Sequence, residues 1–324
     1  MESPFTYNTI AIGSDFLSRK KDVSHLASLI ADGRHAVIYE PPRTGKNSLV
    51  NMALNQFEGN AGYDITHISL IDIIDPEDFL HRMEEVYSLP PEPRHIVYIE
   101  EFQNILRIRD WDRMLHVMEK EWQKPGTPIY IISGSGINAM KLIFEEKKFF
   151  YRMFERVRLS PIDERVISDH ITRTFQKVGR VIEPHQTEYI YNITDGHPWY
   201  IWQLAECCFN LTKGYLSDNM LAEAVDTLLY THAIRFQETV DNLSRYQLYL
   251  LRAIFDGVTK VSSSSIINKY SLNSSANVHR VKEALTKKEV VIFETQDSPR
   301  IIDPIFRVWL DRYYFKTNKT LQDK

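Results

Sequence analysis

The sequence predicts an α/β fold in which helices cover both faces of a parallel sheet, followed by a helical lid and then a winged helix. Three observations lead to this prediction. Apolar strand patterns alternate with helical patterns in the first half of the chain, a purely helical stretch comes next, and three helical patterns then precede a hairpin pattern. We therefore expect four parts: residues 1–160, 161–243, 244–316 and a frayed tail, 317–324.

The composition is that of a globular chain with more than one domain. Of the 324 residues, 43% are apolar and 25% are charged. There is no run of about 18 apolar residues, and residues 1–4 do not begin a secretory signal, so we expect no membrane contact. The only cysteines, Cys207 and Cys208, are neighbours and cannot easily pair with each other. They indicate a cytoplasmic protein and are interpreted as packing residues.

The charge is unevenly distributed along the chain. Residues 1–243 carry 25 basic and 35 acidic side chains, a net charge of −10, whereas residues 244–324 carry 14 and 8, a net charge of +6. A basic C-terminal region on an acidic body indicates DNA or an acidic protein as partner. Scattered solvated lysines are the equally simple alternative.

Helices and strands alternate in the first 160 residues. The spacing of apolar residues predicts helices over 16–30, 48–57, 76–87 and 111–122, and strands over 36–39, 65–73, 95–99 and 128–133. Asp75 is the expected N-cap of the third helix, with Pro76 in its first turn.

The loop after strand 36–39 has the layout of a phosphate-binding loop. Its residues Glu40-x-x-x-x-Gly45-Lys46-Asn47 match G-x-x-x-x-G-K-[ST] except at Glu40 and Asn47. Gly45 lets backbone N–H groups approach a phosphate, the helix N-terminus adds partial positive charge, and Lys46 adds a full charge. The alternative is an ordinary strand–turn–helix with a solvated lysine. The residues predicted to bind phosphate are Pro42, Arg43, Thr44, Gly45, Lys46, Asn47 and Ser48.

Strand 95–99 ends in two adjacent acids, Glu100 and Glu101. In phosphate-loop enzymes the first such acid holds the water shell of Mg²⁺ and the second polarises the attacking water. We therefore predict Glu100 and the Asn47 amide as metal ligands and Glu101 as the catalytic base, facing Lys46 from the adjacent strand. The alternative is a strand that leaves the core through a charged turn.

Two further groups are candidates for contacting a γ-phosphate. Ser133 ends a strand and is the first candidate for a polar sensor, with Ser135 second; a plain Gly/Ser turn is the alternative. The aromatic run 149–158 contains Arg152 and Arg156, either of which could place a guanidinium on a phosphate, in its own chain or in a neighbour. Such a run also fits a strand with a charged outer face.

The second half predicts helices and then a winged helix. Gly196 and Pro198 mark a turn between two helices, and the aromatic residues around it could stack on a purine or form the core of the corner. Helices over 245–255 and 274–288 and a hairpin of strands 290–294 and 300–302 around Asp297 predict winged-helix architecture. In a DNA complex the basic residues facing the duplex would be His279, Arg280, Lys282, Lys287 and Lys288; many winged helices bind only protein.

Several segments together resemble the archaeal-type ATPase family, in the AAA+/STAND class of P-loop NTPases. The resemblance spans about residues 10–315, and its most specific parts are the Glu101-Phe102-Gln103 ending and the Gly196-x-Pro198 turn. The matching segments are 16–22, 42–49, 99–103, 132–135, 194–200 and 303–310.

This resemblance implies an ATP-binding core, a helical lid and a C-terminal winged helix, working as a nucleotide-driven switch with ATP/ADP and Mg²⁺. It implies that Lys46 contacts the β- and γ-phosphates, Glu101 activates water, Ser133 acts as sensor and the Pro198 turn closes over the nucleotide. A protein or DNA partner and a nucleotide-dependent oligomer fit the same class.

The chain departs from the family pattern at three positions, Glu40 and Asn47 in the loop and Glu100 at the end of strand 95–99. Asn47 and Glu100 lie on the Mg²⁺ side, so binding could survive while hydrolysis is slow or lost. The sequence leaves three hypotheses: a slow ATPase switch, a pseudo-ATPase regulator, and a DNA-binding transcription factor.

Overall fold

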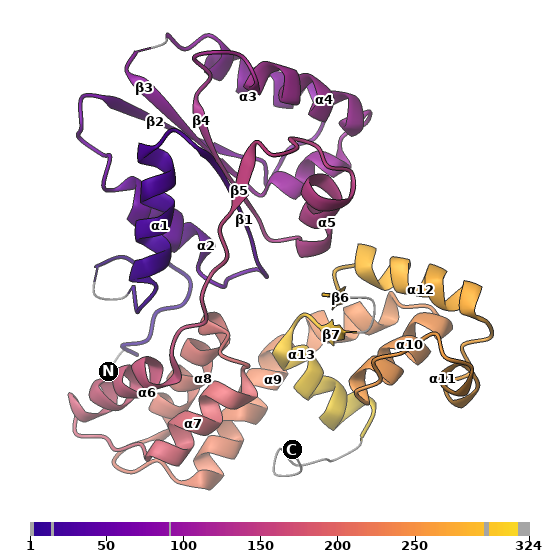
Figure 1. The fold of residues 1–324 in the computed structure, drawn as a ribbon. Coiled ribbons are helices and arrows are strands. Elements are labelled where there is room, and N and C mark those ends of the chain that lie inside the picture. The colour runs from indigo at the N-terminus through magenta and orange to yellow at the C-terminus, as the bar shows by residue number, and fades with distance from the viewer. Residues whose placement is uncertain (1–2, 14–15, 91, 295–297, 317–324) are drawn as a thin grey trace. The chain divides into compact units, whose positions relative to one another are not determined.

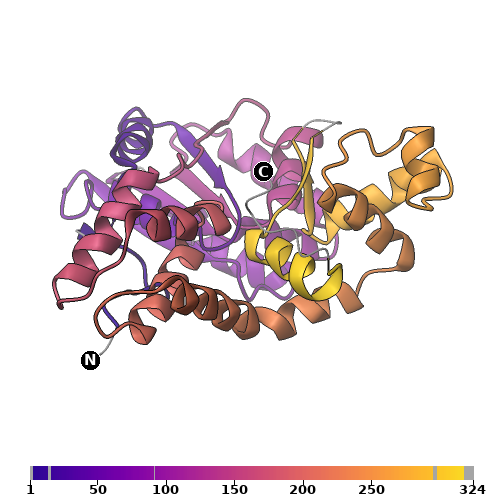
Figure 2. The ribbon, with the colours of Figure 1, turned by 90° about the horizontal axis from the view of Figure 1, so that it is seen from below.

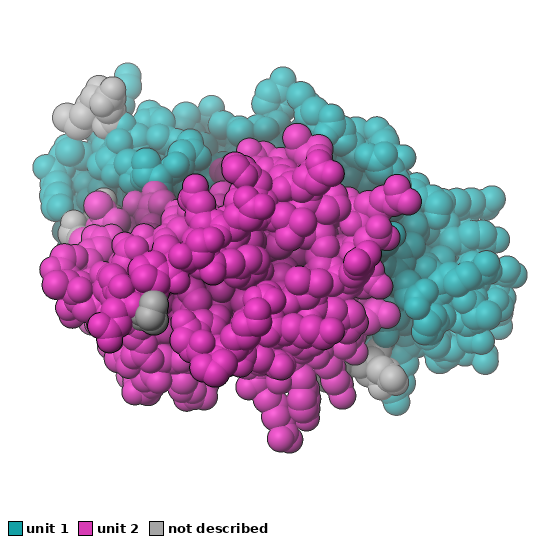
Figure 3. Space-filling model, turned by 90° about the horizontal axis from the view of Figure 1, so that it is seen from above, with its two compact units in different colours: residues 1–9, 162–324 teal, residues 10–161 magenta. Residues whose placement is uncertain are grey.

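The structure is a computed structural model that describes residues 3–13, 16–90, 92–294 and 298–316. The chain divides into two compact units, Ile10–Pro161 and Met1–Thr9 with Ile162–Lys324 (Figure 3). The predictions for the signal region at residues 1–2, the hairpin turn at Asp297 and the tail 317–324 lie outside the described residues.

The unit of residues 10–161 is built on a five-stranded sheet in which every pairing is parallel, as predicted (Figure 1). The strand order is β2-β3-β4-β1-β5. Strands β3 and β4 are buried along almost their whole length, as expected for strands covered on both faces. The strands are β1 (His35–Tyr39), β2 (Tyr63–Ser69), β3 (Arg94–Glu100), β4 (Ile129–Gly134) and β5 (Phe154–Arg156).

Helices pack on both faces of this sheet. On one face, helices α1 (Lys20–Ala31) and α2 (Lys46–Leu54) form a continuous apolar core with alternate residues of the strands, including Ile38, Ile96 and Ile131. On the other face lie α3 (Pro76–Tyr87) and α4 (Trp111–Trp122), where the Trp122 ring stacks on Tyr130 of β4 with centroids 4.0 Å apart. The period-two alternation of the strands thus supplies both cores.

Most predicted element boundaries are close to the observed ones, with three exceptions. Helices α3 and α4 begin and end as predicted, and the Asp75 carboxylate caps α3 by accepting the N–H of Asp78 at 2.8 Å. Helix α1 begins at Lys20 rather than at residue 16, because Ser18 and Arg19 have left-handed φ values of 61° and 60°. Helix α2 ends early, at Leu54, and strand β2 ends at Ser69 instead of 73, where the chain turns.

The second unit begins with four helices: α6 (Glu164–Gln176), α7 (Pro184–Ile193), α8 (Pro198–Leu211) and α9 (Asp218–Asp241). Gly196 has φ 67° and Pro198 occupies the first turn of α8, as the sequence predicts. Phe5 packs against rings of this group, 6.0 Å from Phe209 and 6.2 Å from Trp202, which explains why the first residues belong to this unit. Helix α9 continues toward the C-terminal elements (Figure 2).

The C-terminal elements have the predicted winged-helix order. Ser274 caps α12 by accepting the N–H of Asn277 at 3.2 Å, and β6 and β7 pair antiparallel. A short helix and a π-helical turn follow the hairpin. The elements are α10 (Arg245–Phe255), α11 (Ser264–Lys269), α12 (Ser275–Lys287), β6 (Val291–Phe293), β7 (Pro299–Ile301), α13 (Pro304–Trp309) and η4 (Leu310–Tyr314).

One carboxylate joins three helices of this unit. Asp303 caps α13 by accepting the N–H groups of Ile305 and Phe306, each at 3.0 Å. Its other oxygen accepts the hydroxyl of Tyr200 on α8 at 2.6 Å and the guanidinium of Arg235 on α9 at 3.0 Å. The winged-helix region is thereby fixed to α8 and α9.

No helix within the described residues is long and apolar enough to cross a membrane. Both cysteines are unpaired and lie on α8, where Cys208 is buried and Cys207 is half-buried. They are packing residues, as the sequence predicts.

Candidate functional site

The carboxyl ends of the parallel strands bring the predicted site residues to one edge of the sheet. Strand β1 leads into the loop before α2, β3 ends at Glu100, and β4 ends at Gly134. The prediction that the acids face the loop from the adjacent strand is wrong, because β4 lies between β1 and β3. The order of the strands comes from pairing between distant segments, which spacing along the chain does not determine.

The loop before α2 has the backbone of an anion-binding turn. Gly45 has φ 95° and forms the N-cap of α2, Arg43 has φ 61°, and the Thr44 hydroxyl donates to the Pro41 carbonyl at 2.9 Å. The first N–H groups of a helix have no partner within the helix, and with the helix dipole they favour a bound anion. This part of the predicted phosphate site has a suitable conformation.

Lys46 is a buried cation at the start of α2. Its side chain is only 4% exposed, and its Nζ donates to the carbonyls of Glu40 at 3.0 Å and Pro41 at 2.9 Å. Burial lowers the pKa of Lys46 to about 8, and the carboxylates of Glu101, Glu40 and Glu100 oppose this shift. The alternative of a solvated lysine is therefore wrong.

The two predicted metal ligands bind each other. The Asn47 amide donates to Glu100 Oε1, and its Oδ1 accepts the hydroxyl of Tyr98 at 3.1 Å. Glu100 Oε2 lies 3.3 Å from His67 Nε2, and the His67 ring stacks on Tyr98 with centroids 4.7 Å apart. The structure thus brings Asn47 and Glu100 together, but in a network that uses their polar groups.

Glu101 is held by the end of the neighbouring strand. It has φ 55°, which turns the chain directly after β3. Its Oε2 accepts the hydroxyl of Ser135 and the side-chain amide of Gln103 at 2.6 Å, and Gln103 Oε1 accepts the N–H of Ser135 at 3.2 Å. The sequence does not predict a role for Gln103, although this residue belongs to the Glu101-Phe102-Gln103 segment that carries the family resemblance.

The two candidate sensor serines have different surroundings. Ser133 is fully buried, and its hydroxyl lies 2.8 Å from the hydroxyl of Tyr98. Ser135, the second candidate, binds the predicted base Glu101. Ser133 therefore supports Asn47 indirectly, through the Tyr98 hydroxyl, whereas Ser135 directly contacts the predicted base Glu101. The sensor roles of both serines stay predictions.

The candidate arginines contact residues outside the loop. Arg156 donates to Glu145 at 2.9 Å and lies 3.9 Å from the centre of the Tyr39 ring. Arg152 has φ 59° and lies over the ring of its neighbour Tyr151. In the described part of the chain, the structure records no contact from either arginine to Lys46 or Glu101. A role for Arg152 stays a prediction.

One residue at the loop was not predicted. The guanidinium of Arg19 donates from Nη1 to the Thr44 carbonyl at 2.6 Å and from Nε to the Ser160 carbonyl at 2.7 Å. Burial lowers the pKa of Arg19, and the negative charges of Asp22 and Glu40 oppose this shift. Its only signal was membership of the segment 16–22. Ser48 accepts the N–H of Ala11 at 3.0 Å, and its predicted role toward phosphate stays a prediction.

The turn at Pro198 belongs to the other unit, and its predicted role toward a nucleotide stays a prediction. The stacking of its aromatic residues on a purine is not supported at Tyr200, which is 2% exposed and bound to Asp303. For this residue the alternative of a core aromatic in a helix corner is correct.

Four of the five basic winged-helix residues contact their own chain, including Arg280, which donates to Asn277 at 3.5 Å. Lys288 donates to Gln247 at 3.0 Å and to the Asn242 carbonyl, Lys282 lies 4.0 Å from the centre of the Phe293 ring, and His279 pairs with Glu283.

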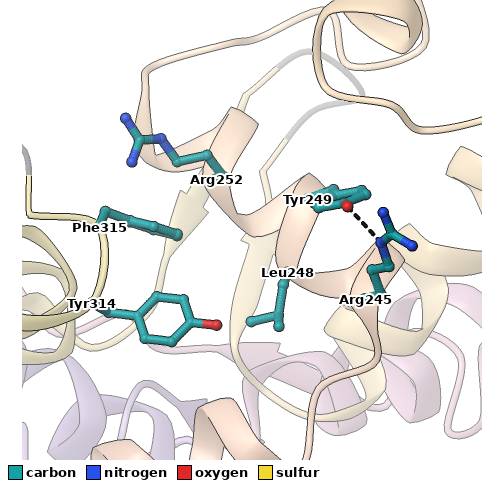
Figure 4. Close-up of a pocket in the computed structure, with 6 residues that line it drawn as sticks. All are labelled: Arg245, Leu248, Tyr249, Arg252, Tyr314 and Phe315. Atoms are coloured by element: carbon teal, nitrogen blue, oxygen red, sulfur yellow. Dashed lines mark hydrogen bonds between the residues drawn. The ribbon is translucent and has the colours of Figure 1, made fainter.

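On α10 and η4, a cavity of about 480 Å³ has apolar walls and two arginines, of which Arg245 binds the Tyr249 hydroxyl (Figure 4). Its lining is Arg245, Leu248, Tyr249, Arg252, Tyr314 and Phe315.

The carboxylate and amide oxygens at the edge of the sheet are suitable ligands for a hydrated Mg²⁺ ion. Within the described ranges, no three His, Cys, Asp or Glu side chains are arranged so that they could hold a metal ion by themselves. Mg²⁺ usually keeps several waters and needs only one or two carboxylates beside the phosphates of its ligand. Glu100 and the Asn47 oxygen could supply such a set.

Comparisons with known proteins agree with this architecture. A family described as "Probable winged helix domain" matches residues 234–312, and no curated protein matches the sequence. The Walker-type ATPase of Pyrococcus abyssi is similar in structure, with a TM-score of 0.70 at 16% identity over 94% of this chain and 99% of that one.

Two further solved structures are similar at lower scores. ORC2 of Aeropyrum pernix, in its ADPNP–ADP complexes, has a TM-score of 0.59 at 15% identity over 95% of this chain and 96% of that one. The RuvB Holliday junction branch migration motor of Thermotoga maritima has 0.51 at 14% identity over 90% and 94%. The chain therefore has the fold of AAA+ P-loop ATPases, with a C-terminal winged helix.

Proposed function

We propose that this protein binds ATP with Mg²⁺ and works as a nucleotide-dependent switch that hydrolyses ATP slowly. The observation that carries the proposal is Lys46, a buried ammonium at the N-terminus of α2 in the field of Glu101. A buried cation is costly unless it is matched by negative charge, and a polyphosphate supplies that charge at this position. The AAA+ fold supports the same conclusion.

The loop residues have separate tasks in this proposal. The backbone of residues 42–48 receives the phosphate oxygens, and Lys46 exchanges its bonds to the Glu40 and Pro41 carbonyls for bonds to phosphate. Glu100 and the Asn47 amide oxygen would hold the hydrated Mg²⁺, which neutralises charge on the phosphates. Ser48 supports the loop through Ala11.

Glu101 is the proposed general base. Its two bonds from Ser135 and Gln103 both end on Oε2, so we assign acceptance of the water proton to Oε1. The same bonds fix the orientation of the carboxylate, as a catalytic base requires. Ser135 and Gln103 are therefore positioning residues for Glu101.

The proposal of slow hydrolysis rests on the Asn47 network. Asn47 and Glu100 are bonded to each other, and also to Tyr98 and His67, so a metal ion has to compete for both. The loss of one electrostatic group can lower the rate of phosphoryl transfer by about 10³-fold. This network is also the observation that favours a second candidate function, a regulator that binds nucleotide without turnover.

Phosphate release from ATP, measured for wild type and Glu101→Gln, tests the proposal. We expect slow release from wild type and at least about a hundredfold less from Glu101→Gln, because the proton acceptor is lost. Binding of a fluorescent ATP analogue should stay within about threefold in Glu101→Gln and disappear in Lys46→Ala.

Glu84→Gln is the matched control, since the Glu84 carboxylate is exposed on α3 and its ion pair is with His81 of the same helix. Phosphate release by this variant should equal that of wild type. Equal background release from wild type and Glu101→Gln, with binding retained, would establish the regulator instead. No binding of ATP or ADP by wild type would reject both candidates.

We further propose a protein partner for the winged helix, because Lys288, Lys282 and His279 are engaged with their own chain. A nucleotide-dependent oligomer would allow Arg152 to reach a neighbouring site. The unpaired cysteines support a reducing, cytoplasmic location.

A further inference from the structure

We propose that Arg19 couples the phosphate-binding loop to the segment Leu159–Pro161, through which the chain leaves the sheet unit, so that a phosphate bound at the loop makes this segment less accessible. The inference rests on the proposed nucleotide site and adds a coupling residue to it. It concerns contacts inside the unit of residues 10–161.

Arg19 holds two distant backbone segments at once. Its Nη1 donates to the Thr44 carbonyl at 2.6 Å, and its Nε donates to the Ser160 carbonyl at 2.7 Å. Asp22, one turn later, accepts the N–H and the hydroxyl of Ser160, each at 2.8 Å. The start of α1 thus binds both the loop and the exit segment.

The local geometry is specific for this arrangement. Ser18 and Arg19 both have left-handed φ, a conformation that is costly for residues with a side chain and that persists where the surroundings enforce it. A Cβ added at Gly45 would lie 2.9 Å from Arg19 Nη1. Gly45 is therefore favoured by its own φ of 95°, and a side chain at this position would also displace the guanidinium.

The planarity of the peptide bond explains the coupling. The Thr44 carbonyl that Arg19 holds and the Gly45 N–H belong to one rigid peptide unit. The bond from Arg19 therefore sets the direction of the Gly45 N–H, one of the donors expected to face a phosphate. Because coupling between two binding events is reciprocal, a phosphate on that N–H strengthens the hold of Arg19 and Asp22 on Ser160.

If Arg19 only stabilised the fold, its removal would have a different effect. Removing it would loosen the exit segment equally with and without nucleotide, and nucleotide affinity would not change. Coupling instead requires that nucleotide protects the segment and that this protection depends on Arg19. The ratio of the two accessibilities, with and without nucleotide, separates the two roles.

Limited digestion of the full chain by trypsin measures this ratio. Arg158 is exposed and directly precedes Leu159, so its peptide bond reports on the segment, with the fragments identified by mass. We expect Mg·ADP to slow cleavage of wild type after Arg158 by about fivefold. In Arg19→Lys, whose ammonium is a point charge without the guanidinium fork, protection should fall below about twofold.

Binding of a fluorescent ADP analogue, measured on the same samples, should weaken in Arg19→Lys by the same factor by which protection is lost. Arg109→Ala is the matched control, because Arg109 is an exposed arginine of the same unit; both ratios should equal those of wild type. Arg19→Lys is used rather than Arg19→Ala because it keeps the positive charge, and we therefore expect it to fold even if Arg19→Ala does not.

If wild type binds ADP and cleavage after Arg158 does not change, the coupling is wrong while the proposed function stands. Equal protection in wild type and Arg19→Lys would also overturn it. If wild type binds no nucleotide, the proposed function and the coupling are both rejected.

Discussion

Lys46 makes nucleotide binding sensitive to pH in a defined range. Its pKa of about 8 means that the ammonium loses its proton as the pH rises through that value, whereas a solvated lysine keeps it to about 10.4. Since a bound phosphate favours the charged form, we expect the dissociation constant of ADP to be flat below pH 8 and to rise about tenfold per pH unit above it. Titrations of a fluorescent ADP analogue at pH 7, 8 and 9 measure this.

Lys46→Arg is the control, because a guanidinium stays charged throughout this range; its dissociation constant should show no bend near pH 8. Equal affinities of wild type at pH 7 and pH 9 would contradict the buried position of Lys46. For stability the sign is opposite. The unfolded chain binds the proton more tightly, so this residue contributes an increase in the free energy of unfolding as pH rises above 8.

At the residue level, the sequence predicted that four side chains of the loop and of the end of strand β3 meet, but it did not predict how they bond. Lys46, Asn47, Glu100 and Glu101 do lie together at the loop, as the motif spacing indicates. The sequence did not show that Ser135 rather than Ser133 would reach Glu101. Ser133 is still inside β4 and buried, whereas Ser135 follows the strand, and this difference depends on where the strand ends.

Among the elements, helix α13 depends on one side chain. Asp303 caps it and also binds Tyr200 and Arg235, so Asp303→Ala removes a cap and two further hydrogen bonds. We expect the free energy of unfolding to fall by about 3 kcal/mol, of which about 1 kcal/mol is the cap. Tyr200→Phe, which loses only the hydroxyl, should cost about 1 kcal/mol. Urea unfolding followed by circular dichroism measures both.

Asp241→Ala is the matched control for this prediction, since Asp241 accepts a single exposed bond from Gln237. Its cost should stay within about 0.5 kcal/mol. A cost for Asp303→Ala no larger than that of the control would show that the carboxylate does not hold α13 to α8 and α9.

Elements with strong local signals were predicted best. Helix α3 has a capping aspartate and a first-turn proline, and α4 has a clear apolar face, so both are correct to the residue. The start of α1 was wrong because Arg19 is held in a left-handed conformation by the distant residues Thr44 and Ser160. Strand order was missed for the same physical reason, since pairing between remote segments leaves no periodicity in the sequence.

For the molecule as a whole, the +6 charge of residues 244–324 does not by itself make a DNA-binding surface. Because Lys288, Lys282 and His279 contact their own chain, we expect the full chain to show no salt-sensitive retention on duplex DNA at about 150 mM salt. Fluorescence anisotropy of a labelled duplex over a salt series measures this.

Binding whose constant falls on a straight line in a plot of its logarithm against the logarithm of the salt concentration would contradict that prediction. If such retention occurs, Arg280→Ala and Lys287→Ala should weaken it, because both side chains are exposed on α12 and Arg280 has only a 3.5 Å contact to Asn277. Arg113→Ala on α4 is the control, since it lies in the other unit.

The two adjacent free thiols of α8, Cys207 and Cys208, allow the opening of the second unit to be measured by chemical labelling. They are the only two cysteines in the chain, and burial raises the pKa of Cys207 to about 11 and that of Cys208 further. A folded α8 should therefore react slowly with alkylating reagents near neutral pH, and labelling of the buried Cys208 records an opening of that helix. Counting labels by mass over time would follow the helical unit separately from the sheet, without introducing any foreign probe.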